Sequence, residues 1–112
     1  MPIQNADYSN INFDEMAASI GLKAKHIPML IGSFLEETPA ALISLHKAVE
    51  NRDFAAIQAQ AHFLKGSAGN LRFNEVYEMS KEIEFAAESS KEDFDYEGYF
   101  NAIKSAVETI PN

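Results

Sequence analysis

The chain has 112 residues, which is room for one domain with a single hydrophobic core. Its 17 acidic residues against 9 basic ones give a net charge of −8, which argues against binding to nucleic acids or to anionic membrane surfaces. Because cysteine is absent, disulfides, zinc–thiolate sites, iron–sulfur clusters and thiol catalysis are excluded. No apolar run approaches the roughly 20 residues of a membrane span, and the first residues lack the features of a signal peptide. We therefore expect a soluble cytoplasmic protein.

The beginning of the chain predicts an irregular leader and one short helix. Residues 1–11 are polar and irregular in pattern, and we expect them to be loosely held. Asn12 is a typical N-cap, and the acidic residues just after it suit the positive end of a helix dipole. We expect this helix to end near Ile20, because Gly21 is a typical stop.

A long second helix is predicted over residues 24–51. Pro28 falls in its first turn, where the missing N–H costs little. Pro39 is interior, but the apolar phase is kept across it, so we expect a kink and not a break. The apolar positions at three-to-four spacing are Ile27, Ile31, Phe34, Ala41, Leu45 and Ala48.

Three further helices are predicted over residues 53–71, 74–89 and 95–110, the first of them capped by Asp53. Long helices with short connections favour an all-α, antiparallel four-helix bundle with a short additional N-terminal helix. We expect one domain over residues 1–112, with the bundle spanning about residues 12–110. The inward faces of the last two helices are predicted to be Val76, Met79, Ile83 and Ala86, and Tyr96, Tyr99, Ile103, Ala106, Val107 and Ile110.

One histidine on the helix over residues 53–71 stands apart from the apolar stripe. At about 100° per residue, His62 falls about 130° from the middle of that stripe, on the solvent side. Gly69 lies about 20° from His62 around the helix, Gly66 and Gln58 about 40°, and Lys65 about 60°. The stripe itself consists of Phe54, Ile57, Ala61, Leu64, Ala68 and Leu71.

These neighbours suit phosphoryl chemistry on His62. A glycine inside a helix lowers the stability of the helix by about 1 kcal/mol relative to alanine. Stability therefore does not explain the presence of two glycines on one exposed face. We infer that Gly66 and Gly69 clear the approach of another molecule. Neutral imidazole is a good nucleophile toward phosphorus, and Lys65 can offset the charge of a bound phosphoryl group.

The same run resembles the signature of histidine-containing phosphotransfer domains, the HPt family. That signature is approximately His-x-Leu-Lys-Gly-Ser-Ala-x-Asn-Leu-Gly, and residues 61–71 read Ala-His-Phe-Leu-Lys-Gly-Ser-Ala-Gly-Asn-Leu. The flanks are also similar, in residues 34–42 and in the Ile83–Glu84 pair. The resemblance covers nearly all of the chain from about residue 12. One departure is Arg72, where the family commonly has glycine, and it adds a charge near the docking face.

The resemblance implies a four-helix bundle that relays phosphoryl groups between the aspartates of receiver domains through a phosphohistidine. It places phosphoacceptance on His62, charge stabilisation on Lys65 and access on Gly66. It further implies that the chain is a carrier that is consumed and regenerated, with no ATP-dependent kinase activity. The resemblance also implies that the receiver domain supplies the Mg²⁺ ion and that this chain binds no cofactor. The implied partners are the receiver domains of response regulators and/or hybrid sensor kinases, and we expect a monomer because an exposed functional histidine favours one.

Two alternatives stay open on the sequence. The chain could be a phosphoacceptor module from a larger hybrid or chemotaxis-type histidine kinase, with an ATP-binding domain as donor. It could also be a module that docks receivers without taking a phosphoryl group. The Met1 start and the end soon after the last helix favour a stand-alone protein over the first alternative, and His62, Lys65 and Gly66 together argue against the second.

The remaining candidates carry weaker signals. Gln58 contacts the phosphoryl group or is simply solvated, and Phe63 packs on an adjacent helix or contributes to an apolar docking rim. We interpret His26 and His46 as surface residues. No metal site is expected, because the chain contains no Glu-x-x-His or His-x-x-x-His pair.

Overall fold

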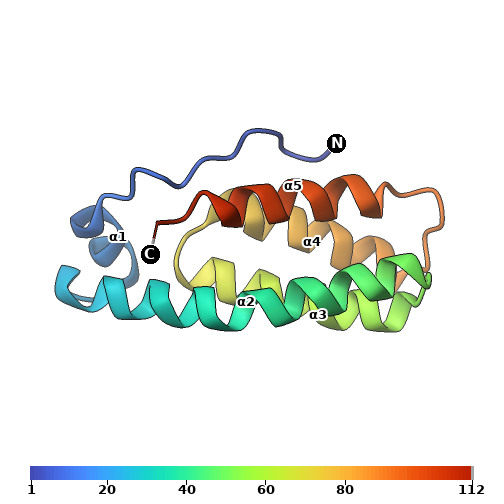
Figure 1. Cartoon of the computed structure of the whole chain (residues 1–112), viewed down its shortest axis with the longest axis horizontal. Coiled ribbons are helices and arrows are strands. Elements are labelled where there is room, and N and C mark those ends of the chain that lie inside the picture. Colours follow the sequence, from blue (N-terminus) through green and yellow to red (C-terminus); the bar gives the residue numbers. More distant parts are fainter. Residues whose placement is uncertain (112) are drawn as a thin grey trace.

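Helices account for most of the described part of the chain, residues 1–111, in the computed structural model (Figure 1). Within these residues there is no strand. Four long helices pack as an elongated antiparallel bundle, and a short helix lies at one end. The molecule as a whole measures 43 × 22 × 20 Å. The prediction of an all-α four-helix bundle with a short additional N-terminal helix is confirmed. The helices are α1 (Phe13–Ile20), α2 (Ile27–Glu50), α3 (Phe54–Asn70), α4 (Asn74–Glu88) and α5 (Tyr96–Glu108), and a 3₁₀ turn, η1 (Ala24–His26), precedes α2.

Helix boundaries follow local capping chemistry. The side chain of Asn12 accepts a hydrogen bond from the backbone N–H of Glu15 at 3.0 Å, and Asp53 does the same for Ala56 at 3.2 Å. Gly21 ends α1 with a φ of 74°, a left-handed conformation that glycine adopts without a steric cost. These caps explain why the predicted helix boundaries agree with the observed ones to within a few residues.

Helix α2 remains one helix across Pro39, as expected. It begins at Ile27, three residues later than predicted, because residues 24–26 form the 3₁₀ turn. Just before the proline, the buried hydroxyl of Thr38 donates to the carbonyl oxygen of Phe34 at 2.6 Å.

The bundle core contains the predicted apolar stripes. Every residue predicted to face inward on α2, α4 and α5 is buried. On α3 the stripe is buried except at its start, where Phe54 is only half-buried. Helix α3 packs mainly against α4 and α2. One side of α3 therefore faces α4 and another side faces α2.

The leader is irregular, as predicted, but the expectation that it is loosely held is wrong. It runs along the outside of the bundle beside α5 (Figure 1). The backbone N–H of Tyr8 donates to Oγ1 of Thr109 at 2.8 Å, and its hydroxyl donates to Glu75 at 2.8 Å. The Tyr8 ring also lies 4.7 Å from that of Phe73, centroid to centroid. These anchors come from single side chains, which a periodicity argument does not detect.

None of the helices within residues 1–111 combines the length and the apolarity that a membrane span requires.

Candidate functional site

His62 lies in the middle of α3 and points out of the bundle, with 70% of its side chain exposed. Its Nδ1 atom is 2.7 Å from Oε2 of Glu84 on the neighbouring helix α4. A carboxylate only accepts hydrogen bonds, so Nδ1 of the neutral ring carries the proton and donates it. The lone pair of the neutral ring is then on Nε2. The contact thus selects one tautomer and one ring orientation for an exposed histidine.

Lys65 joins the same cluster through the other carboxylate oxygen. Its Nζ atom lies 2.6 Å from Oε1 of Glu84, and 24% of the lysine side chain is exposed. The hydrogen bond to Glu84 raises the pKa of the Lys65 ammonium above its usual value. Glu84 therefore holds His62 with one oxygen and Lys65 with the other.

Glu84 stays ionised despite its burial. Only 10% of its side chain is exposed, and this burial raises the pKa of the carboxyl group. The hydrogen bonds from Lys65 and His62, together with their charges, outweigh burial and hold the pKa below its usual value. One negative and one positive charge thus balance beneath the imidazole.

The two glycines near His62 have different surroundings. A Cβ atom added to Gly66 would meet nothing within 4 Å, so this position leaves open space beside the histidine. A Cβ atom added to Gly69 would lie 3.0 Å from Cδ1 of Tyr77 on α4. The structure thus gives Gly69 a packing role that the helical wheel missed, because the wheel shows angles around one helix and not its neighbours.

The remaining predicted residues lie on α3, on α2 and in the 3₁₀ turn before α2. Gln58 is half-buried on the same side of α3 as Lys65. Phe63 is 40% exposed, so it is at the surface and not in the core. His46 is on α2, where its ring stacks on Phe100 at 4.7 Å and its Nε2 lies 3.4 Å from Glu97. His26 is half-buried in the 3₁₀ turn before α2.

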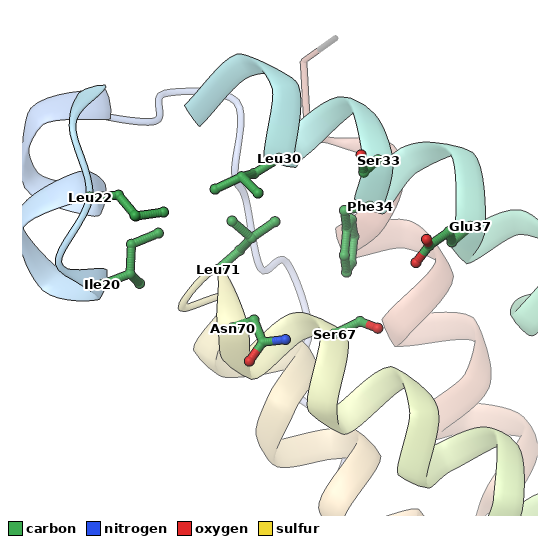
Figure 2. A pocket seen from close by; sticks show the side chains of 9 residues that line it. All are labelled: Ile20, Leu22, Leu30, Ser33, Phe34, Glu37, Ser67, Asn70 and Leu71. Atoms are coloured by element: carbon green, nitrogen blue, oxygen red, sulfur yellow. The ribbon is translucent and has the colours of Figure 1, made fainter. Parts of the chain in front are cut away.

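A pocket of about 360 Å³ lies beside the second half of α3 (Figure 2). Ser67 and Asn70 of α3 form one side of it, and Leu30 of α2 lies across from them. Leu22, just after α1, points into it from the end of the bundle. Both residues are polar, so this side of the pocket offers hydrogen-bonding groups.

Glu84 is the site residue whose role sequence reasoning missed. In the sequence it stands out only as part of the Ile83–Glu84 pair, although the spacing of its neighbours signals its burial. Val76, Ser80 and Glu84 follow one another at i, i+4 spacing, and all three are buried. Burial of a charged residue is costly unless it has a charged or hydrogen-bonding partner. On α3 these partners are His62 and Lys65.

Clusters of three or more histidine, aspartate or glutamate side chains that could hold a metal ion do not occur within residues 1–111.

Comparison with protein families gives a match over most of the chain. A family model described as Hpt domain matches residues 29–111, which is 83 of the 112 residues. The matched segment contains all of α3, α4 and α5 and most of α2, and therefore His62, Lys65 and Glu84. Among curated proteins and solved structures, no match is found.

Proposed function

The chain belongs to the Hpt domain family, and we propose that it accepts a phosphoryl group on Nε2 of His62 from a receiver-domain aspartate and passes it to another such aspartate. Hpt domains take part in the phosphotransfer of two-component systems, where they interact with receiver domains. The observation that carries the proposal is the 2.7 Å contact between Nδ1 of the exposed His62 and Glu84.

In the proposed step one bond to phosphorus replaces another. The Nε2 lone pair attacks phosphorus in line with the acyl-phosphate O–P bond, the P–N bond forms, and the receiver's aspartate leaves as a carboxylate. Nδ1 keeps its proton throughout. The product is a phosphorylated imidazolium, and its positive charge lies beside the Glu84 carboxylate. Reversal of these steps with a second receiver returns His62 to its starting tautomer.

We propose that Lys65 binds the phosphoryl group once it is on His62. In the free protein its ammonium group is bound to Glu84. When a phosphoryl group is present on His62, one helical turn away, the flexible lysine can bridge to a phosphoryl oxygen. Glu84 then keeps the protonated Nδ1 as its partner, so no buried charge is left alone.

The partner supplies the rest of the chemistry. We propose that the receiver domain brings the Mg²⁺ ion and the acidic pocket, and that this chain holds no cofactor and no ATP. The face around Gly66 gives the receiver room to bring its aspartyl phosphate to the imidazole. The chain is then a carrier, phosphorylated and regenerated in each cycle, and not a free-standing enzyme.

Transfer of label from a phosphorylated receiver tests the proposal. The wild type, His62→Gln and His46→Gln are each incubated with radiolabelled, phosphorylated receiver domains of the same genome. His46→Gln is the matched control, since His46 is a partly exposed histidine that also faces a carboxylate. We expect acid-labile, alkali-stable label on the wild type and on His46→Gln but not on His62→Gln. Label on all three proteins, or on none with any receiver, contradicts the proposal; label only after addition of an ATP-binding kinase domain favours the kinase-module alternative.

A further inference from the structure

The connection between α3 and α4 contains an arginine in a backbone conformation that favours glycine. Arg72 has a φ of 61°. The backbone N–H of Phe73 donates to the carbonyl oxygen of Ala68 at 3.0 Å, and that of Arg72 donates to Gly69 at 3.2 Å. This pair of hydrogen bonds is the Schellman motif, in which the left-handed position is usually glycine. A residue with a Cβ atom has an unfavourable backbone energy in this left-handed conformation. Favourable contacts of the Arg72 side chain can offset that cost.

The guanidinium group of Arg72 makes contacts with two helix ends. Nη1 donates to the carbonyl oxygen of Gly69 at 2.9 Å, and Nη2 donates to that of Ser19 at 3.1 Å. Gly69 is in the last turn of α3 and Ser19 in the last turn of α1. Both carbonyl groups belong to the negative ends of helix dipoles, which a cation stabilises. One side chain therefore fastens α1 to the end of the helix that carries His62.

Helix α1 has few other attachments. Of its eight residues only Ala17 is buried, and its main contacts are with the following 3₁₀ turn and with α2. A short helix with so little buried surface is held weakly by packing alone. Met16 and Ile20 are partly buried against the core, and the hydrogen bond from Arg72 to Ser19 adds a direct link between the end of α1 and the end of α3.

The position of α1 matters because its end forms a wall of the pocket beside α3. Ile20, the last residue of α1, and Leu22, just after it, line the pocket and face Leu30 and Phe34 of α2 (Figure 2). The walls are mainly apolar, and Glu37 is the one charged lining residue among those described. The chemistry of the pocket therefore fits an apolar side chain.

The pocket also lies within reach of a partner bound at His62. Ser67 is five residues after His62, which is about 7.5 Å along the axis of an α-helix. A standard protein interface covers about 800 Å² on each partner, equivalent to a disc of about 16 Å radius. Around the helix Ser67 lies about 140° from His62, with the exposed Phe63 between them, so a receiver domain that covers both His62 and Phe63 also reaches the edge of the pocket.

We propose that Arg72 is a positioning residue for receiver docking: its guanidinium group holds α1 so that Ile20 and Leu22 wall a pocket for an apolar side chain of the receiver. The inference rests on the proposed function, since the occupant is the phosphoryl donor. Arg72 does not touch the reacting atoms, so it acts on binding of the receiver and not on the chemical step.

Arg72→Gly is the sharpest test, because glycine suits the positive φ and keeps the end of α3 while it removes the guanidinium group. The probe is the receiver domain, among those of the same genome, that binds the wild type most tightly in titration calorimetry. We expect Arg72→Gly to raise the Kd for this receiver, and the KM of transfer from its phosphorylated form, about tenfold, with kcat within about twofold. The exposed pocket residue Leu22, changed to serine, should give the same pattern. The exposed Ile43→Ser, on α2 and outside this pocket, should leave both values unchanged.

Two further measurements distinguish a loss of receiver docking from a general loss of structure or of His62 reactivity. Hydrogen exchange of the α1 amides should be faster in Arg72→Gly, and those of α3 unchanged. Phosphorylation of His62 by phosphoramidate, a small donor that needs no docking, should proceed at the wild-type rate. An unchanged Kd and KM in Arg72→Gly overturn the inference, and so does an equal loss of rate with phosphoramidate. If the wild type binds the receiver but takes no phosphoryl group from it, the proposed function fails, and the Kd values still test Arg72.

Discussion

Nδ1 of His62 lies 2.7 Å from Oε2 of Glu84, a residue 22 positions later in the chain and on the adjacent helix. The contact turns a surface histidine into an oriented one, with its protonated nitrogen facing the bundle. In the proposed transfer, a carboxylate in this position would also stabilise the positive ring that forms when Nε2 takes a phosphoryl group. This pair is the main support for the proposed transfer through Nε2 of His62.

Replacement of Glu84 tests the role of that carboxylate. We expect Glu84→Gln to slow phosphoryl transfer from a receiver about tenfold or more, because a hydrogen bond to a charged group contributes about 1.5–3 kcal/mol. The measurement is the single-turnover rate at saturating receiver. Glu78→Gln, at an exposed position of the same helix, is the control and should react at the wild-type rate. Equal rates in the two variants mean that Glu84 does not assist the transfer.

Removal of Lys65 should affect the phosphorylated state more than docking. We expect Lys65→Met to lower kcat for transfer about tenfold with little change in KM, since a charge-assisted contact to the phosphoryl group is lost. Kinetics with a phosphorylated receiver measure both parameters. Lys104→Met, which removes an exposed lysine on α5, is the matched control. A change confined to KM is incompatible with the proposed part of Lys65.

The stability of the bundle should depend on pH through Glu84. Because the pKa of this carboxyl group is lowered in the fold, the folded state binds fewer protons than the unfolded state near the usual glutamate pKa of 4.5. The stabilisation is therefore present above about pH 4.5 and lost as the pH falls through the folded-state pKa. We expect the free energy of unfolding of the wild type to exceed that of Glu84→Gln at pH 7, and the difference to shrink steadily below about pH 4.5. Urea titrations of both proteins from pH 7 to pH 3 measure it; a difference that is constant over this range is inconsistent with an ionised Glu84.

The two glycines of α3 should respond differently to alanine. Gly66→Ala has open space for the methyl group, so we expect the free energy of unfolding to rise by about 1 kcal/mol from helix propensity. At Gly69 the methyl group would lie 3.0 Å from the Tyr77 ring, so Gly69→Ala should gain less or lose stability. Urea denaturation compares the variants. Gly66→Ala should also raise the KM for a phosphorylated receiver, since it narrows the approach to His62, while phosphoramidate should react as before. A gain in stability at Gly69 as large as that at Gly66 contradicts the packing role of Gly69.

The helices were predictable from sequence because their signals are local. Asn12 and Asp53 cap helices through their own side chains, and the apolar stripes repeat within each helix. The position of His62 on the exposed side of α3 followed from the same periodicity. Pattern reasoning therefore recovered the bundle and the exposed face that carries the candidate site.

The features that were missed depend on residues brought together by the bundle. Glu84 becomes a partner of His62 only when α3 and α4 lie side by side, and Tyr77 covers Gly69 for the same reason. Tyr8 anchors the leader through Thr109, a contact that spans 101 positions of sequence. Arg72 departs from the glycine of the family signature, and only the fold places Ser19 where its guanidinium group can bind.

The position of the phosphoryl group on the imidazole tests the central claim most directly. After transfer from a phosphorylated receiver to ¹⁵N-histidine-labelled protein, NMR of the ring nitrogens identifies both the residue and the atom that carries phosphorus. The account predicts one phosphorylated histidine, His62, with phosphorus on Nε2 and a proton on Nδ1. Phosphorus on Nδ1 of His62, or on His26 or His46, would contradict it.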